Sequence, residues 1–84
     1  MQRSQTPDRV EREKINGVQT KISIYYRDPE YEVRIEVDRT ESWAFGIDDG
    51  AVAELLTTSH GSRVVPDWLD ESLAGLGVAE VDAA

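Results

Sequence analysis

Three stretches between Val18 and Ile47 alternate apolar with polar side chains, and this pattern limits the fold more than any other feature of the chain. A period of two residues is typical of β-strands that have one buried and one wet face. The alternation therefore predicts three strands of an antiparallel sheet with one apolar face. The expected inward positions are Val18, Thr20, Ile22, Ile24 and Tyr26, then Tyr31, Val33, Ile35 and Val37, then Trp43, Phe45 and Ile47.

Two short polar segments join these stretches and determine how the strands pair. Residues 27–30 and 39–41 have the composition of turns. In the resulting register, inward side chains lie opposite one another, and Lys21 lies opposite Glu36 on the wet face. The other expected partners are Tyr26–Tyr31, Ile24–Val33, Ile22–Ile35 and Thr20–Val37 across the first turn, and Val37–Trp43, Ile35–Phe45 and Val33–Ile47 across the second.

The first fifteen residues fit two local structures. Asn16-Gly17 is a strong signal for a two-residue hairpin, and it predicts an edge strand from Arg9 to Ile15 paired with the first alternating stretch. Thr6-Pro7-Asp8 is instead typical of a helix start, because proline is favoured at the first helical position. We prefer the edge strand, which adds only Ile15 to the core.

Beyond Ile47 the apolar period lengthens toward the 3.6 residues of a helix. Asp48 and Asp49 favour a helix N-terminus, and residues 51–56 then form an apolar stripe that ends near His60. A hairpin at Asp49-Gly50 is the competing interpretation, although the segment that follows has better helix than strand propensity. We therefore expect a short helix after the three strands.

A second short helix is expected to begin at Pro66, with three acidic side chains in its first turns and leucines along one side. Gly75 or Gly77 is expected to end it. Residues 63–65, between the two helices, are a candidate fourth strand. The sequence thus predicts an α+β fold: a three- to four-stranded antiparallel β-meander followed by two short helices packed on one face.

The length of 84 residues suits one domain, 1–84, because smaller units rarely bury enough apolar surface to fold alone. We expect residues 1–8 and 78–84 to be flexible. No stretch reaches the roughly 18 apolar residues of a membrane span, and the first residues lack the apolar run of a signal peptide. A cytoplasmic protein is expected, placed in the host cytoplasm or the virion if the chain is viral.

The net charge is −8, and residues 64–84 contain five acidic residues but no Lys or Arg. Proteins that bind nucleic acid directly usually carry a basic patch, so this charge argues against such binding. Acidity is equally expected of a protein from a salt-adapted source, and by itself it does not establish recognition. The absence of cysteine excludes disulfides and thiolate chemistry.

Residues with catalytic or metal-binding potential are few, and each has a simpler structural explanation. His60, the only histidine, is expected to interact with the dipole of a helix C-terminus. Asp48-Asp49-Gly50 lacks the alternating oxygen ligands and the closing Glu of a calcium loop. The carboxylates on the wet sheet face have no apolar neighbours that would raise a pKa. We therefore expect no enzyme, no cofactor and no metal site.

Large aromatic side chains away from the core are candidates for interface anchors. Trp43 and Phe45 belong to the expected core, whereas Tyr25 lies on the wet face and Trp68 lies one position off the leucine stripe; Trp68 could equally cover the edge of the core. The candidate partner-binding residues are Tyr25, Glu32, Arg34, Glu36, Asp67, Trp68, Asp70 and Glu71.

The leading functional hypothesis is a small acidic protein-binding module whose partner has a basic surface, because charge complementarity steers such association. One specific version is a viral or mobile-element inhibitor that engages a basic nucleic-acid-binding protein. The alternative is a structural subunit of a homo-oligomer or of a larger assembly such as a virion, in which an outer strand pairs between chains and the acidity reflects a salt-adapted source.

Overall fold

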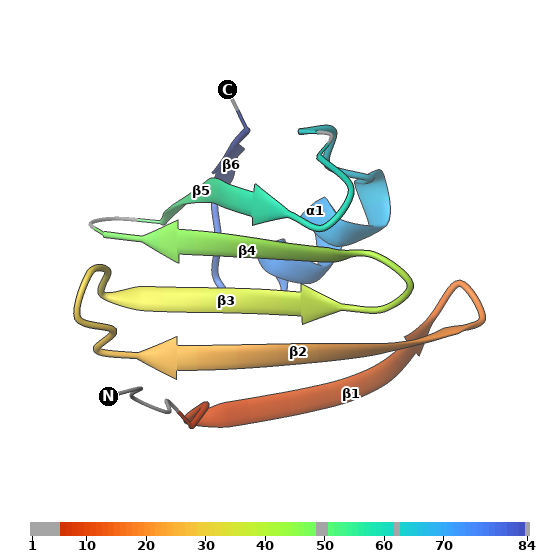
Figure 1. Ribbon diagram of the computed structural model, residues 1–84, viewed down its shortest axis with the longest axis horizontal. Coiled ribbons are helices and arrows are strands. Elements are labelled where there is room, and N and C mark those ends of the chain that lie inside the picture. Colours follow the sequence, from red (N-terminus) through yellow and green to blue (C-terminus); the bar gives the residue numbers. More distant parts are fainter. Residues whose placement is uncertain (1–5, 49–50, 62, 84) are drawn as a thin grey trace.

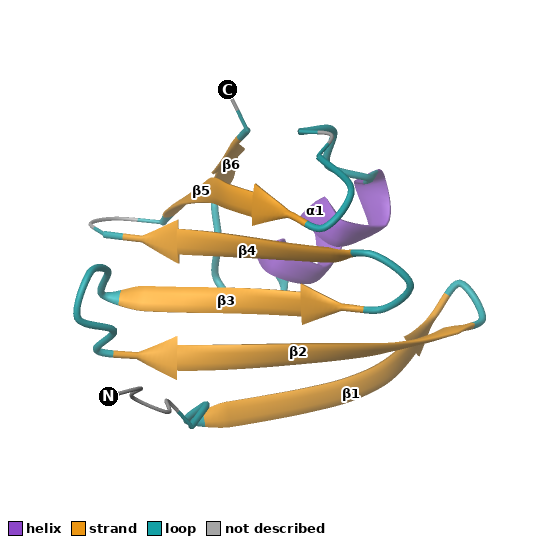
Figure 2. Ribbon diagram, in the orientation of Figure 1, coloured by secondary structure: helices purple, strands orange, loops and turns teal. Residues whose placement is uncertain are grey.

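A computed structural model describes residues 6–48, 51–61 and 63–83. Within them the chain forms one six-stranded sheet and one short helix (Figures 1 and 2). The strands lie in the sheet in their order along the chain; neighbours are antiparallel except for the last pair, β5 and β6, which is parallel. The elements are β1 (Arg9–Ile15), β2 (Val18–Tyr26), β3 (Val33–Asp38), β4 (Ser42–Ile47), β5 (Val52–Thr58), α1 (Asp67–Ala74) and β6 (Glu80–Asp82).

The expected hairpin at Asn16-Gly17 is present and makes β1 an edge strand. Both turn residues have positive φ, 52° and 81°, which is the conformation that a type I′ turn requires. β1 pairs with β2 from Arg9–Ile24 to Ile15–Val18. The helix considered for the N-terminal segment does not form in residues 6–15.

The register between β2 and β3 differs from the expected one by two residues. The connection is a six-residue loop, in which the Asp28 side chain accepts a hydrogen bond from the Glu30 N–H at 2.9 Å and Arg27 has φ 59°. Tyr31 therefore belongs to the loop, and Val33 takes the place opposite Tyr26. The observed pairs are Tyr26–Val33, Ile24–Ile35, Ile22–Val37 and Lys21–Asp38. The expected β3–β4 register is confirmed at all three predicted pairs.

The segment predicted as the first helix is the strand β5. It pairs with β4 from Trp43–Thr58 to Gly46–Glu54, with a bulge beside Phe45. Ala53 and Leu55 are buried in the core, and their neighbours Val52, Glu54 and Leu56 are exposed or half-buried, so pairing with a free sheet edge overrides helix propensity. Asp49 and Gly50, which the competing hairpin hypothesis involved, lie outside the described residues.

The helix predicted from Pro66 is confirmed as α1. Its end is a Schellman motif, in which the Val78 N–H donates to the Leu73 carbonyl and the Gly77 N–H to the Ala74 carbonyl, both at 3.1 Å. Gly77 has φ 99°, which favours glycine at this position. Gly77 is thus the residue that ends the turn.

The predicted strand at residues 63–65 does not form where the chain is described. Arg63 instead reaches the sheet edge: its guanidinium donates to the carbonyl oxygens of Leu55 at 2.6 Å and Ala83 at 3.1 Å. The C-terminal segment, expected to be frayed, contains β6, and Val78 before it is buried. The fold class predicted above is therefore wrong: the molecule is mostly β, with a mixed sheet and one helix.

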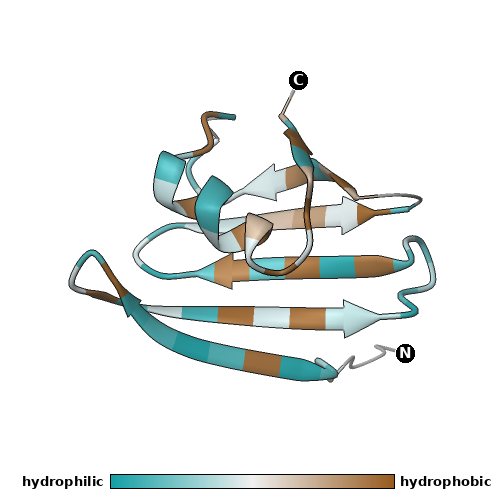
Figure 3. Ribbon diagram, turned by 180° about the vertical axis from the view of Figure 1, so that it is seen from behind, coloured by the Kyte–Doolittle hydropathy of each residue, from teal (hydrophilic) through white to brown (hydrophobic). Residues whose placement is uncertain are grey.

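The core lies between the sheet and α1, which covers one face (Figure 3). We call this the covered face and the opposite one the open face. Leu69 and Leu73 of α1 are fully buried there, against apolar side chains from the sheet. The strand residues of the core are Ile22, Ile24, Ile35, Val37, Trp43, Phe45, Ile47, Ala53 and Leu55.

Candidate functional site

The predicted interaction residues fall into two groups on opposite faces of the sheet. Tyr25, Arg34 and Glu36 lie on the open face, where Tyr25 pairs directly with Arg34 across β2 and β3. Asp67, Trp68, Asp70 and Glu71 belong to α1, on the covered face. Glu32 is exposed in the loop before β3. A single partner surface therefore cannot include all eight residues.

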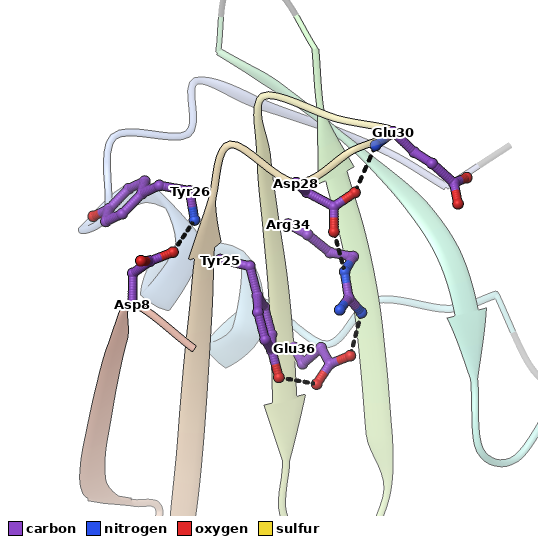
Figure 4. Close-up of polar contacts among 7 residues, drawn as sticks. All are labelled: Asp8, Tyr25, Tyr26, Asp28, Glu30, Arg34 and Glu36. Atoms are coloured by element: carbon purple, nitrogen blue, oxygen red, sulfur yellow. Dashed lines mark hydrogen bonds and ion pairs between the residues drawn. The ribbon is translucent and has the colours of Figure 1, made fainter. Parts of the chain in front are cut away.

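The open-face group forms a polar network (Figure 4). Arg34 forms ion pairs with Asp28, at 3.0 Å, and with Glu36. The Tyr25 hydroxyl donates a hydrogen bond to Glu36 at 3.1 Å, and the Arg34 guanidinium lies 4.4 Å from the centre of the Tyr25 ring. Strand spacing predicted that Tyr25, Arg34 and Glu36 share a face, and the cross-strand register brings them into contact.

The charged side chains of this network pair with one another: both carboxylates contact the single guanidinium of Arg34. Burial and the negative charge of Glu36 raise the pKa of the Tyr25 hydroxyl. Burial alone would lower the pKa of Arg34, but hydrogen bonds with Asp28 and Glu36 raise it above its usual value. Tyr25 is only 8% exposed, so it is not the exposed anchor that the alternation of β2 predicted. The cluster holds β2, β3 and their connecting loop together.

Asp28 makes the stability of this loop dependent on pH. The Glu30 N–H, and after it Arg34, lower the pKa of the Asp28 carboxyl, so the folded protein favours the charged form. A carboxylate with a lowered pKa stabilises the fold above its ordinary pKa, near 4, and loses that contribution as pH falls through this range. Asp28→Asn should cost about 1 kcal/mol at pH 7 and less at pH 3, measured by urea unfolding. An equal cost at both pH values would contradict this role.

Trp68 covers one end of the core. Its ring meets Trp43 edge-on, with centroids 5.5 Å apart, and the Arg39 guanidinium lies 4.3 Å from its centre. Trp68 was predicted either as an interface anchor or as a side chain that covers the edge of the core. These contacts are those of a side chain at the edge of the core.

His60 does not end a helix as expected: it follows β5, where its Nδ1 lies 3.3 Å from a Glu41 carboxylate oxygen.

A groove lies on the covered face, between β1 and the C-terminal part of α1. It consists of two cavities of about 420 and 450 Å³ that share Glu11, Gly75 and Leu76 in their walls. We call it the β1–α1 groove. Its other lining residues are Arg9, Glu13, Ile15, Asn16, Ile22, Ile24, Tyr26, Val33, Ile35, Ile47, Ala51, Trp68, Glu71, Ser72, Gly77 and Val78.

The groove has a mixed polar and apolar lining, with acidic side chains in its walls. Ile22, Ile24 and Ile35 lie on the covered face of the sheet, and at one end Tyr26 is 46% exposed. Glu11 and Glu13 of β1 and Glu71 of α1 supply three acidic side chains, against Arg9, which pairs with Glu11.

Only two of the predicted partner-binding residues, Trp68 and Glu71, line the groove. The remaining residues of the groove were not predicted, because the groove depends on where α1 packs on the sheet. The alternation within a strand does not determine that position. One signal was present: Glu11 and Glu13 share the core face of β1, where a strand covered by a helix would carry apolar side chains.

No group of three or more His, Cys, Asp or Glu side chains in the described residues is placed to hold a metal ion. No helix in the described ranges is long and apolar enough to span a membrane. Comparisons of the chain with protein-family models, with curated proteins and with solved structures gave no match. The chemistry of the surface is therefore the basis for a functional proposal.

Proposed function

We propose that the chain is a small acidic protein-binding module that engages the basic surface of a partner protein. The main support is the electrostatics of the helix layer. Asp67, Asp70 and Glu71 are exposed on α1, whose last turn has no basic residue to offset them. Within the described residues these charges form no ion pair, and they remain available to a cationic partner. Such complementarity raises association rates and disfavours acidic partners.

The alternative, a structural subunit joined edge to edge, has less support. Exposed strand edges pair readily unless charged side chains or short length prevent it. Here β1 is an edge with five charged residues among seven, and β6, at the other edge, has three residues of which two are acidic. Arg63 also occupies carbonyl groups of β5 and of the C-terminal segment. These features oppose pairing between chains.

Affinity capture from an extract of the source cells, followed by titration of the purified partner, tests the proposal. The comparison uses the triple variant Asp67→Lys, Asp70→Lys, Glu71→Lys and, with the same change of charge, the variant Glu30→Lys, Glu54→Lys, Glu80→Lys, which alters exposed acids elsewhere. We expect a basic partner that binds the wild type and the second variant, and binds the α1 variant at least tenfold more weakly at about 0.1 M salt.

Partners that bind both variants equally, or whose affinity is unchanged between about 0.1 and 1 M salt, would refute the proposal, because screening removes exposed charge interactions at the higher concentration. Circular dichroism of each variant verifies that the fold is retained.

A further inference from the structure

We propose that the β1–α1 groove binds one linear segment of the partner, with apolar side chains in its two cavities and Lys or Arg side chains against its acidic walls. This inference rests on the proposed function and names the site and the chemistry of the ligand. The two cavities are continuous, since both include Glu11, Gly75 and Leu76. They extend along β1 from Arg9 to Ile15 and reach Asn16 in the turn that follows.

The shape of the groove favours a chain segment over a compact small molecule. The seven residues of β1 span roughly 20 Å at about 3.3 Å per residue, and the groove follows this strand. Each cavity has room for a large apolar side chain. Partly exposed apolar side chains lie at both ends: Tyr26 in the first cavity, and Ile15 and Trp68 in the second, where the Trp68 ring also contacts Arg39.

The charge of the groove selects basic segments. Three glutamates and Arg9 line its walls, and Arg39 lies at the Trp68 end, so acidic side chains outnumber basic ones by three to two. Glu13 is exposed and forms no ion pair with another described residue. An acidic segment would be repelled, whereas Lys or Arg beside the apolar anchors would be attracted.

The helix layer leaves this part of the sheet open because α1 has only eight residues. Its buried residues, Leu69 and Leu73, belong to the single core cluster, whereas β1 contributes no buried residue to it. Figure 3 shows β1 at the margin of the sheet, away from the helix. A bound segment would extend the covered layer over β1 and β2, as helices cover sheets in other two-layer domains.

The test pans a random twelve-residue peptide library on the immobilised protein and measures the affinity of enriched synthetic peptides by fluorescence anisotropy. Two groove variants are compared with wild type. Gly75→Phe introduces a large side chain at the point where the two cavities meet. The backbone at Gly75 accepts a side chain, because its φ is −65° and an added Cβ would approach no atom closer than 3.4 Å. Glu13→Lys reverses one wall charge, and Glu30→Lys is the control with equal charge change outside the groove.

We expect enriched peptides to combine apolar residues with Lys or Arg. Gly75→Phe should weaken their binding at least tenfold at any salt concentration, because it fills space without changing charge. Glu13→Lys should weaken binding about fivefold at 0.1 M salt and less at 1 M, and Glu30→Lys less than twofold. Enriched peptides without basic residues, or binding unchanged by both groove variants, would overturn the inference.

The two proposals fail in different ways. A captured basic partner that is lost on reversal of the α1 charges but still binds the Gly75→Phe variant would refute the groove and leave the proposed function standing. A captured partner that is insensitive to charge reversal would refute the proposed function, and with it the claim that the groove selects basic segments.

Discussion

Truncation of Phe45 to alanine is expected to lower the free energy of unfolding by about 3–5 kcal/mol, the usual cost of deleting a buried phenylalanine. Phe45 has no exposed surface and lies on β4 between Ile35 of β3 and Leu55 of β5. A domain of 84 residues is typically stable by about 4–13 kcal/mol, so this one change removes much of the total. Urea unfolding followed by circular dichroism measures it.

The matched control is Val64→Ala, which also removes apolar atoms but at a residue that is 71% exposed. Its effect should stay within about 0.5 kcal/mol. If Phe45→Ala lost less than about 1.5 kcal/mol, the described packing between the sheet and α1 would be wrong.

Gly46→Ala is expected to destabilise the protein by about 1–3 kcal/mol, although glycine to alanine in a strand is usually favourable. A Cβ at Gly46 would lie 2.7–2.8 Å from three carbon atoms of the Tyr31 ring, closer than such atoms can approach. Tyr31 packs on this glycine after leaving the expected β3 strand. Thermal and urea unfolding of the variant measure the cost.

A second change identifies the cause of this effect. In the double variant Gly46→Ala, Tyr31→Ala the close contact is gone, so the two single effects should not add, with an interaction energy of about 1 kcal/mol or more. Gly75→Ala, where an added Cβ makes only ordinary contacts, should instead raise stability by about 0.4–1 kcal/mol. Additive effects at Gly46 and Tyr31 would contradict the contact.

The parts of the fold that the sequence predicts are those governed by local chemistry. Asn16-Gly17 correctly predicted the first hairpin, and the short turn at residues 39–41 correctly predicted the β3–β4 register. Pro66 correctly predicted the start of α1. The β2–β3 register was missed because the Asp28 side chain builds a longer loop than composition implies. Strand β5 was missed because a free sheet edge, which is a tertiary feature, outweighs the helix propensity of residues 51–56.

The candidate site was predicted less well for the same physical reason. Alternation placed Tyr25, Arg34 and Glu36 on one face, but exposure depends on neighbouring side chains, and Arg34 covers Tyr25. Trp68 and Glu71 were identified individually, whereas the groove that contains them exists only because α1 is short and packs away from β1. The pattern of side chains within one strand or helix does not predict a groove that forms between two elements.

The sequential order of the strands also determines how the molecule responds to mechanical force. β1 and β6 occupy opposite edges of the sheet (Figure 1). Tension applied through the two ends of the chain therefore acts across the strands, along the direction of the interstrand hydrogen bonds. In this geometry the bonds of each strand pair break one after another, as in unzipping, and do not share the load as they do when strands are sheared. The protein should extend at low force, from its outer strands inward.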